Sequence, residues 1–151
     1  PVGTVNFTPP EIQGKDYKSF LRTKKHEYYA VATLVFMILL PGKPPYSQQG
    51  GTNPAANIKK MDFSYPLGEK TNKKTPDGTW RFIWSHLPFY LKDKLYDVFK
   101  NNKRIEVSHW IDLLTRYKHD LAKGHLTNDL FPSDFKPISQ YAKDKFKVKV
   151  R

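Results

Sequence analysis

The sequence EYYAVATLVFMILLPGKPPY, residues 27–46, decides how the rest of the chain must fold. After Glu27 it has no charged residue before Lys43, and apolar side chains fill nearly every position of a helix over 27–40. A helix that is apolar on every side belongs in the core of a domain, and this run is shorter than the roughly 20 residues that cross a bilayer. Gly42 and the prolines after it are typical of a helix end. We therefore expect a buried helix over 27–40, with no membrane span, around which the other segments pack.

The composition limits the classes of protein to which the chain can belong. A chain of 151 residues with 38% hydrophobic and 15% aromatic residues is long and apolar enough to form one folded domain. The 26 Lys and Arg residues against 14 Asp and Glu give a net charge of +12, which favours anionic partners. The absence of cysteine excludes disulfides and thiolate metal sites. The start PVGTVNFTPPE lacks a basic and then apolar run, so we expect no signal peptide and a cytoplasmic protein.

The segments before residue 80 contain one further clear helix signal. Residues 1–14 hold three prolines and two glycines and predict an extended loop, and residues 15–26 predict a short basic helix followed by a turn. Asn53 is a suitable N-cap because Pro54 follows it at the first helical position, so a short helix is expected there. Residues 63–79 have no hydrophobic period and predict a long loop.

Two more helices are expected in the second half. Leucine or phenylalanine recurs every four residues from Leu87 to Phe99, which indicates an amphipathic helix that begins near Pro88. A last helix fits residues 107–119. The tail from Lys123 is interrupted by proline and ends in KFKVKVR, a pattern that suits an edge strand or a basic arm. The prediction is an all-α chain with a central buried helix, shorter helices around it and long loops.

Four segments, taken in order, resemble the C-terminal half of protein kinase catalytic domains. GTVNFTPPE (3–11) resembles the end of an activation segment, and residues 27–46 resemble the central helix of the C-lobe with the turn that follows it. IKKMDFSYP (58–66) is similar to the exit from the next short helix. The apolar repeat ahead of Arg104 resembles the penultimate helix and the arginine that precedes the last one. The closest pattern is that of a bacterial branch of kinase-like proteins.

The resemblance implies a fold and its boundaries. Residues 1–122 would form the helical C-lobe of a protein Ser/Thr kinase-like domain, and residues 123–151 a basic C-terminal tail. A kinase phosphorylates proteins, so the resemblance also implies a protein substrate and, as a second partner, the N-terminal half that completes the domain.

The resemblance assigns an ion pair to two residues far apart in the sequence. In the family, the glutamate of the P-P-E motif pairs with the arginine before the last helix, and Glu11 and Arg104 occupy these positions. The pair would be buried and would join the activation segment to the lobe. Breaking a buried pair from one side is expensive, because the remaining charge has no partner.

Other site residues follow from the same resemblance. Gly3, Thr4, Phe7 and Thr8 would form the P+1 loop, the wall beside the residue that follows the phosphoacceptor. Phe7 stands where the family usually has tyrosine. Glu27 falls where the family has the aspartate that begins the central helix and accepts N–H groups from the catalytic loop. A carboxylate there also suits the positive end of the helix dipole.

The groups that carry out phosphoryl transfer are missing from the sequence. That reaction needs a Gly-rich loop, a strand lysine, a catalytic Asp with its Asn, and a Mg²⁺-binding Asp, and no motif of these kinds occurs. We therefore expect no catalytic residue in this chain, and ATP and Mg²⁺ only on a complete kinase domain. The sequence begins inside the expected activation segment, so the chain reads as a fragment that is inactive alone and leaves apolar surface where the catalytic loop would pack.

Two alternatives to a fragment of an active kinase stay open. The lysine clusters, including 59–60, 70–74 and the KFKVKVR end, would suit a non-catalytic module that binds nucleic acid or an acidic protein, with an affinity that falls as salt rises. A pseudokinase that regulates a partner is the other alternative. The five histidines have no metal-type spacing, and we expect no metal site. His26 is interpreted as a helix-start or packing residue rather than a ligand or a base.

Overall fold

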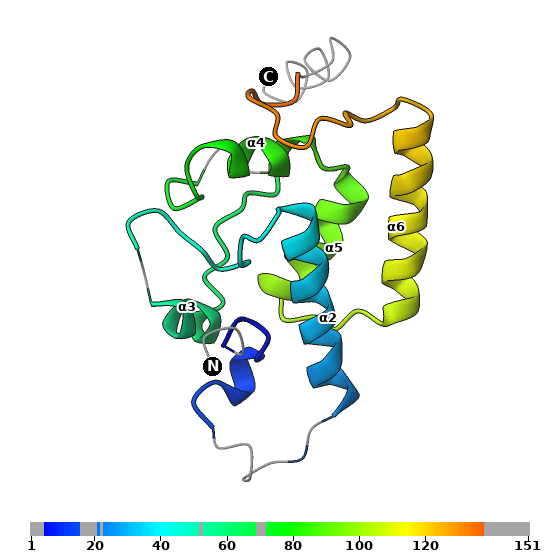
Figure 1. The fold of residues 1–151 in the computed structure, drawn as a ribbon. Helices are drawn as coiled ribbons and strands as arrows, with labels where there is room; N and C mark the ends of the chain where they lie inside the picture. The colour runs from blue at the N-terminus through cyan, green and yellow to red at the C-terminus, as the bar shows by residue number, and fades with distance from the viewer. Residues whose placement is uncertain (1–4, 16–20, 22, 52, 69–71, 138–151) are drawn as a thin grey trace, which may run out of the picture.

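The computed structural model describes residues 5–15, 21, 23–51, 53–68 and 72–137 (Figure 1). These residues form helices joined by loops and contain no strand. The elements in order are η1 (Pro10–Ile12), α2 (Lys24–Leu39), α3 (Pro54–Lys60), α4 (Thr79–His86), α5 (Phe89–Phe99) and α6 (Val107–Ala122). The expected all-α fold is confirmed.

The central helix α2 begins earlier than the sequence suggested. Thr23 is the N-cap, and its backbone N–H donates to Nδ1 of His26 at 3.2 Å, so the first turn is already formed before Glu27. At the other end, Gly42 has φ of 75° and its N–H donates to the carbonyl of Met37 at 2.8 Å. Glycine adopts this left-handed backbone without steric cost, which explains the end of the helix here.

The core is built around one aromatic ring of α2. Phe36 is fully buried and lies between 5.4 and 6.4 Å, centroid to centroid, from four other rings, which belong to Phe63, Tyr65, Trp84 and Phe99. Most of these pairs are edge-to-face, the geometry that the ring quadrupoles prefer. The core therefore joins α2 to the loop after α3, to α4 and to α5, which packs along α2 in Figure 1.

α2 is not enclosed on every side. Its core side is buried, but Leu34 is 51% exposed and Ile38 is 66% exposed. The expectation that an all-apolar helix is surrounded completely is wrong for this face, because no described segment covers it. The helix therefore presents two large aliphatic side chains to solvent.

The remaining predicted helices are present. Asn53 caps α3, and its Oδ1 accepts from the N–H of Ala56 at 3.3 Å. α5 follows Pro88, and α6 runs slightly beyond the predicted residue 119 to Ala122. α4 was not predicted; its Trp80, Ile83 and Trp84 repeat like a helix, but over only eight residues.

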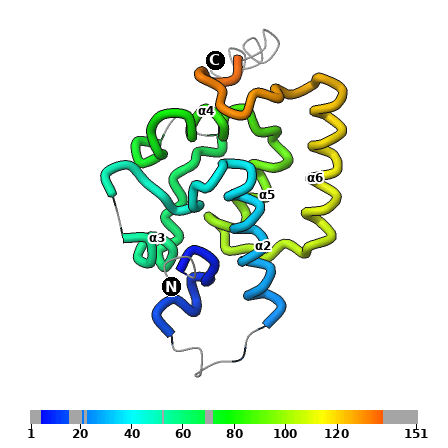
Figure 2. The backbone as a smooth tube through the Cα atoms, viewed as in Figure 1, coloured from blue at the N-terminus to red at the C-terminus, as the bar shows by residue number. Residues whose placement is uncertain are grey.

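The N-terminal segment is not simply extended. Val5 and Asn6 are helical, and Pro10–Ile12 form the 3-10 turn η1, which packs on α3 (Figure 2). Proline at the first position of such a turn loses no hydrogen bond, since that N–H has no partner in a helix anyway. The short helix expected in 15–26 falls largely on residues 16–20 and 22, outside the described residues.

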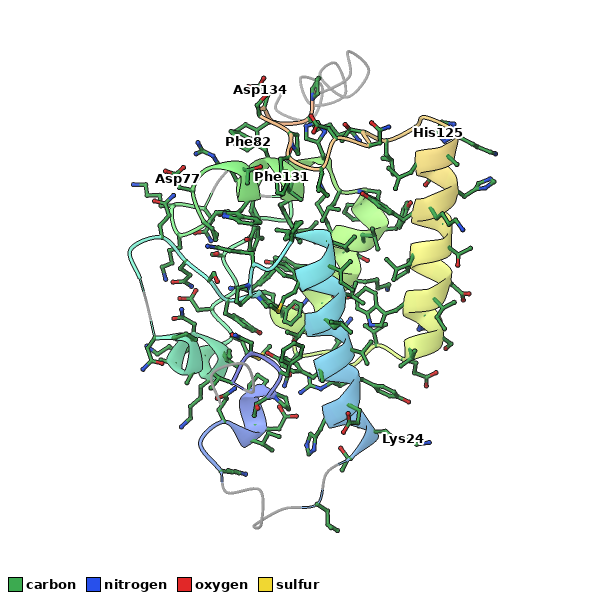
Figure 3. All side chains as sticks on the ribbon, in the orientation of Figure 1. Lys24, Asp77, Phe82, His125, Phe131 and Asp134 are labelled. Atoms are coloured by element: carbon green, nitrogen blue, oxygen red, sulfur yellow. The ribbon has the colours of Figure 1, made fainter. Side chains whose placement is uncertain are left out.

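The described part of the tail, residues 123–137, runs from α6 back to α4. The rings of Phe82 and Phe135 meet edge-on with centroids 4.9 Å apart. The backbone N–H of Lys136 donates to Oγ of Ser85 at 2.9 Å. Figure 3 shows Phe82, Phe131 and Asp134 at this end of the molecule. The KFKVKVR end, predicted to be a strand or arm, lies outside the described residues.

Within the described part of the chain, no helix has both the length and the apolar character needed to span a membrane.

The packing predicts unequal effects of two substitutions on α2. We expect Phe36→Ala to lower the free energy of unfolding by about 3–5 kcal/mol, because it leaves a cavity among four rings. Ile38→Ala, two residues along the same helix, should change it by no more than about 0.5 kcal/mol, because Ile38 already contacts solvent. Urea unfolding followed by circular dichroism measures both, and equal losses would contradict this view of the core.

Candidate functional site

The structure brings Glu11 and Arg104 together across 93 residues of sequence. Nη2 of Arg104 donates to both carboxylate oxygens of Glu11, at 2.7 and 2.9 Å. The arginine side chain is only 10% exposed, whereas the glutamate side chain is 42% exposed. The pair is thus half-buried rather than buried: a desolvated cation is neutralised by a carboxylate that keeps contact with water.

A third residue completes the coordination of the guanidinium. Nη1 of Arg104 donates to Oδ1 of Asn102 at 2.6 Å and to its backbone carbonyl at 3.3 Å. Asn102 has φ of 56°, a left-handed conformation that asparagine tolerates better than most residues. The loop between α5 and α6 therefore holds Arg104 from one end, and Glu11 holds it from the other.

α2 supports the same arginine. The guanidinium carbon lies 5.2 Å from the centre of the Tyr29 ring, within reach of a cation–π interaction. Tyr29 is fully buried, and burial raises the pKa of its hydroxyl well above the usual range, so the ring stays neutral. Nε2 of His26 lies 4.0 Å from Oε1 of Glu11. Nδ1 of His26 accepts from the backbone N–H of Thr23, so Nε2 is the ring nitrogen on the side of the carboxylate.

The segment of the expected P+1 loop is held by Gln13. Its Nε2 donates to the carbonyls of Val5, at 2.9 Å, and Thr8, at 2.7 Å, and so closes residues 5–8 into a compact loop. Phe7 and Thr8 are half-buried in that loop. Gly3 and Thr4, the other two residues assigned to it, lie outside the described residues.

Glu27 lies in the first turn of α2 and is exposed. A carboxylate in a first turn interacts favourably with the helix dipole. Glu27 is the fourth residue of the helix rather than its start, because Thr23 takes the capping position. Glu27, Leu34 and Ile38 are separated by seven and four residues, which places them on one face of α2.

The site can hold segments together, and it has no ligand set for a metal. No group of three His, Asp or Glu side chains is arranged for a metal ion among the residues that the structure describes. The contacts around Arg104 join η1, the start of α2 and the loop before α6, three parts of the chain that are distant in sequence. We call this set of contacts, made by Glu11, Tyr29 and Asn102 with Arg104, the Arg104 clamp.

The supporting residues were not predicted as site residues from the sequence. Gln13, Tyr29 and Asn102 act through contacts with backbone groups or with a distant arginine, and no short motif marks such contacts. For Asn102 the sequence contained one indication, the pair Asn101-Asn102 directly after α5. Asparagine is common among residues that adopt a positive φ just beyond the end of a helix.

Comparisons with known proteins found similarity to protein kinases. "Protein kinase YegI" of Escherichia coli strain K12 and of strain O157:H7 are each 35% identical to this chain over 65 residues. An "Aurora kinase" of Patiria pectinifera is 34% identical over 65 residues. Each match covers 42% of this chain, but only 10% of the two Escherichia coli proteins and 14% of the Patiria protein. No family model and no solved structure matches the chain.

The geometry around Arg104 predicts a stability defect when one partner is removed. We expect Arg104→Met to lower the free energy of unfolding by about 2–3 kcal/mol, less than for a fully buried pair because Glu11 contacts water. Glu11→Gln should lower the free energy of unfolding by about 1 kcal/mol, and the double variant should lose less than the sum of the two single losses, because the residues contact each other.

The matched control is Lys103→Met. Lys103 is the neighbouring cation, but its side chain is 63% exposed and it lies 3.9 Å from Asp97, so its loss should change stability by less than about 0.5 kcal/mol. Urea unfolding measures the full set. Additive losses for Glu11 and Arg104 would show that the two residues do not act as a pair.

Proposed function

We propose that this chain, which contains a protein-kinase-like region, forms part of the helical C-lobe of a protein Ser/Thr kinase domain. The matches to YegI and Aurora kinase over 65 residues support the kinase-like region. The chain spans only about a tenth of the length of the YegI proteins, so the activity of a whole kinase is part of the proposal.

The single observation that carries the proposal is the contact between Glu11 and Arg104. The kinase resemblance requires an ion pair between the P-P-E motif and the arginine before the last helix, and these two side chains meet at 2.7 Å. We propose that the pair fixes residues 5–13 on the lobe and that Phe7 and Thr8 then face the substrate beside the phosphoacceptor. In this role Gln13 keeps the loop closed.

The exposed face of α2 supports a second part of the proposal. Glu27, Leu34 and Ile38 share this face, and a kinase would place its catalytic loop at the same helix. We propose that the missing half of the kinase domain packs here, with apolar contacts to Leu34 and Ile38 and N–H groups directed to Glu27. The expected partners are therefore that half and a protein substrate.

Catalysis is assigned to the completed domain. The sequence holds no Gly-rich phosphate loop, no strand lysine and no Mg²⁺-binding motif of the kinase type. We propose that ATP and Mg²⁺ bind only when these groups are supplied by other sequence. A pseudokinase scaffold would use the same lobe without transfer. Nothing in the comparisons supports nucleic-acid binding, and a cytoplasmic location stays a prediction.

The first test uses the chain alone. We expect no incorporation of labelled phosphate from Mg-ATP into the chain or into a general protein substrate, because the sequence lacks the Gly-rich loop, the strand lysine and the Mg²⁺-binding motif of kinases. A complete kinase assayed in parallel is the positive control. Autophosphorylation of the isolated chain would refute the proposal that phosphoryl transfer requires the completed kinase domain.

The second test asks whether the kinase-like region works inside a kinase. The 65-residue stretch of YegI that matches this chain is replaced by the corresponding stretch of this chain, and autophosphorylation is measured. We expect a folded hybrid that retains activity within about tenfold of the parent, since the helices should repack with compatible volumes. The control hybrid carries the same stretch with its residues shuffled. A folded hybrid without activity would count against the proposal.

A further inference from the structure

The tail after α6 returns to α4 and lies against it without joining the core (Figure 1). Residues 123–137 form neither helix nor strand. Among the residues that the structure describes, none after Tyr117 belongs to the hydrophobic core around Phe36. α4 lies outside the four segments on which the kinase resemblance rests. We call residues 130–136, which make the contacts with α4, the docked segment.

Two polar side chains of α4 contact the main chain of the docked segment. Nε2 of His86 lies 2.9 Å from the carbonyl oxygen of Asp134, which is a hydrogen-bond distance. The backbone N–H of Lys136 donates to Oγ of Ser85, also at 2.9 Å. Main-chain groups are common to all sequences, so these contacts hold a backbone in place without selecting particular side chains.

Thr79 supplies a third contact with the main chain. Its Oγ1 donates to the carbonyl of Pro132 in a long hydrogen bond of 3.5 Å, and Pro132 is buried. The rings of Pro132 and Pro137 fix the φ angles of these residues. The docked segment therefore loses less conformational freedom on docking than a segment without proline would lose.

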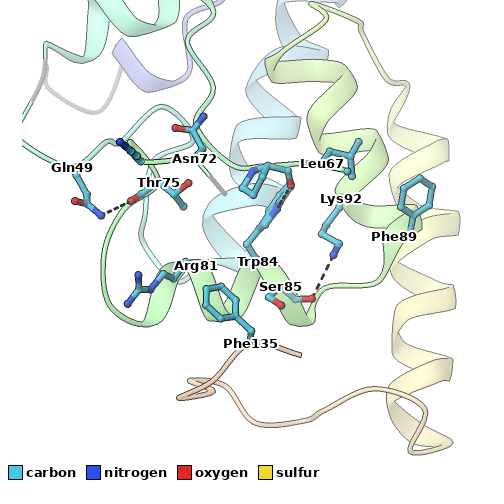
Figure 4. Close-up of a pocket in the computed structure, with 13 residues that line it drawn as sticks. Gln49, Leu67, Asn72, Thr75, Arg81, Trp84, Ser85, Phe89, Lys92 and Phe135 are labelled. Carbon is cyan, nitrogen blue, oxygen red and sulfur yellow. Dashed lines mark hydrogen bonds between the residues drawn. The ribbon is translucent and has the colours of Figure 1, made fainter. Parts of the chain in front are cut away.

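Phe135 is the aromatic anchor of the docked segment. Its ring meets that of Phe82 edge-on, at 79° with centroids 4.9 Å apart, and the guanidinium carbon of Arg81 lies 5.9 Å from its centre. Figure 4 shows the Phe135 ring beside α4, where it is also a wall of a cavity of about 500 Å³. Edge-on ring packing and a cation–π contact both require a π-system, so this position favours an aromatic over an aliphatic side chain.

The docked segment is held less firmly than the helices. Its large apolar side chains stay largely in solvent, since Leu130 is 61%, Phe131 51% and Phe135 53% exposed. Segments with few buried apolar contacts open at a lower free energy than the core does. We therefore expect the segment to detach from α4 and uncover Phe82 while the helices stay folded.

We propose that α4 carries a docking site for a peptide segment with an aromatic residue, and that residues 130–136 of this chain occupy it as an intramolecular ligand. A protein segment that offers an aromatic side chain and main-chain groups in the same arrangement takes the place of the tail. The tail thus controls access to α4. The site uses none of the residues of the Arg104 clamp and does not depend on the proposed kinase function.

The experiment supplies the tail as a separate peptide. A fluorescent peptide of residues 127–137, TNDLFPSDFKP, is titrated into the full chain that carries Phe135→Ser and so lacks the anchor, and fluorescence anisotropy measures binding. We expect saturable binding to this variant. The unchanged chain should bind the peptide at least about tenfold more weakly, because its own tail competes at the high effective concentration that a covalent link provides.

Two altered peptides test the aromatic anchor. The peptide with Phe135→Tyr should bind within about threefold of the parent peptide, because the ring is retained. The peptide with Phe135→Leu should bind about tenfold more weakly, because it loses both the ring pair and the cation–π contact.

Substitutions on α4 test the other side of the contact in the full chain. The Lys136 amide reports opening of the docked segment, because its N–H donates to Ser85. Phe82→Leu and His86→Leu should each speed hydrogen exchange of this amide by about tenfold, while the amides of α5 keep their rates. His119→Leu, which removes an exposed histidine of α6, is the matched control and should change neither. Circular dichroism establishes that each variant is folded.

Several results would overturn the proposal. They are the absence of peptide binding to the folded Phe135→Ser chain, equal binding by the unchanged chain, and equal binding of the parent and leucine peptides. Exchange of the Lys136 amide as slow as that of the α5 amides in every variant would also overturn it, since the tail would then open only with the whole fold. None of these measurements involves phosphoryl transfer, so their failure is distinguishable from failure of the proposed function.

Discussion

The burial of Phe36 on α2 is the contact on which the rest of the structure depends. Its ring meets four others, which come from the loop after α3, from α4 and from α5. These contacts position the two candidate sites of the molecule, which are the ion pair around Arg104 and the cavity beside Trp84. The end of α5 leads to the loop that carries Arg104, and Trp84 of α4 is at once a core residue and a wall of a cavity of about 500 Å³ between α4 and the start of α5.

The positive charge of Arg104 and that of the cations near α4 differ in how far they are buried and in what balances them. Arg104 is almost buried, and Glu11 and Asn102 supply acceptors while Tyr29 supplies a ring face, so that its charge is balanced within the chain. Near α4, Arg81 pairs with Asp77 at 3.3 Å while its side chain stays 42% exposed, and Nζ of Lys92 donates to the carbonyl of Ser85 at 3.4 Å. A buried cation that is balanced within the chain stabilises the fold, because neither charge of the pair is left without a partner.

The success of sequence interpretation varied with the range of the contacts involved. Asn53-Pro54 marked the start of α3 because a cap and the residue after it interact locally. The period of four from Leu87 to Phe99 predicted α5 for the same reason. α4 was missed because eight residues are too few to establish a helical period. The cavity was missed too, because its lining comes from segments between Gln49 and Phe135.

The sequence by itself determined the all-α fold, the central helix and the likeness to protein kinases, since apolar periodicity, caps and motif order are all local properties. Only the tertiary structure decided which face of that helix is covered, leaving Leu34 and Ile38 exposed beside Glu27. It also decided that the side chain of Arg104 is only 10% exposed, whereas that of its partner Glu11 is 42% exposed. Burial and charge balance depend on which distant segments come together, and no stretch of sequence contains that information.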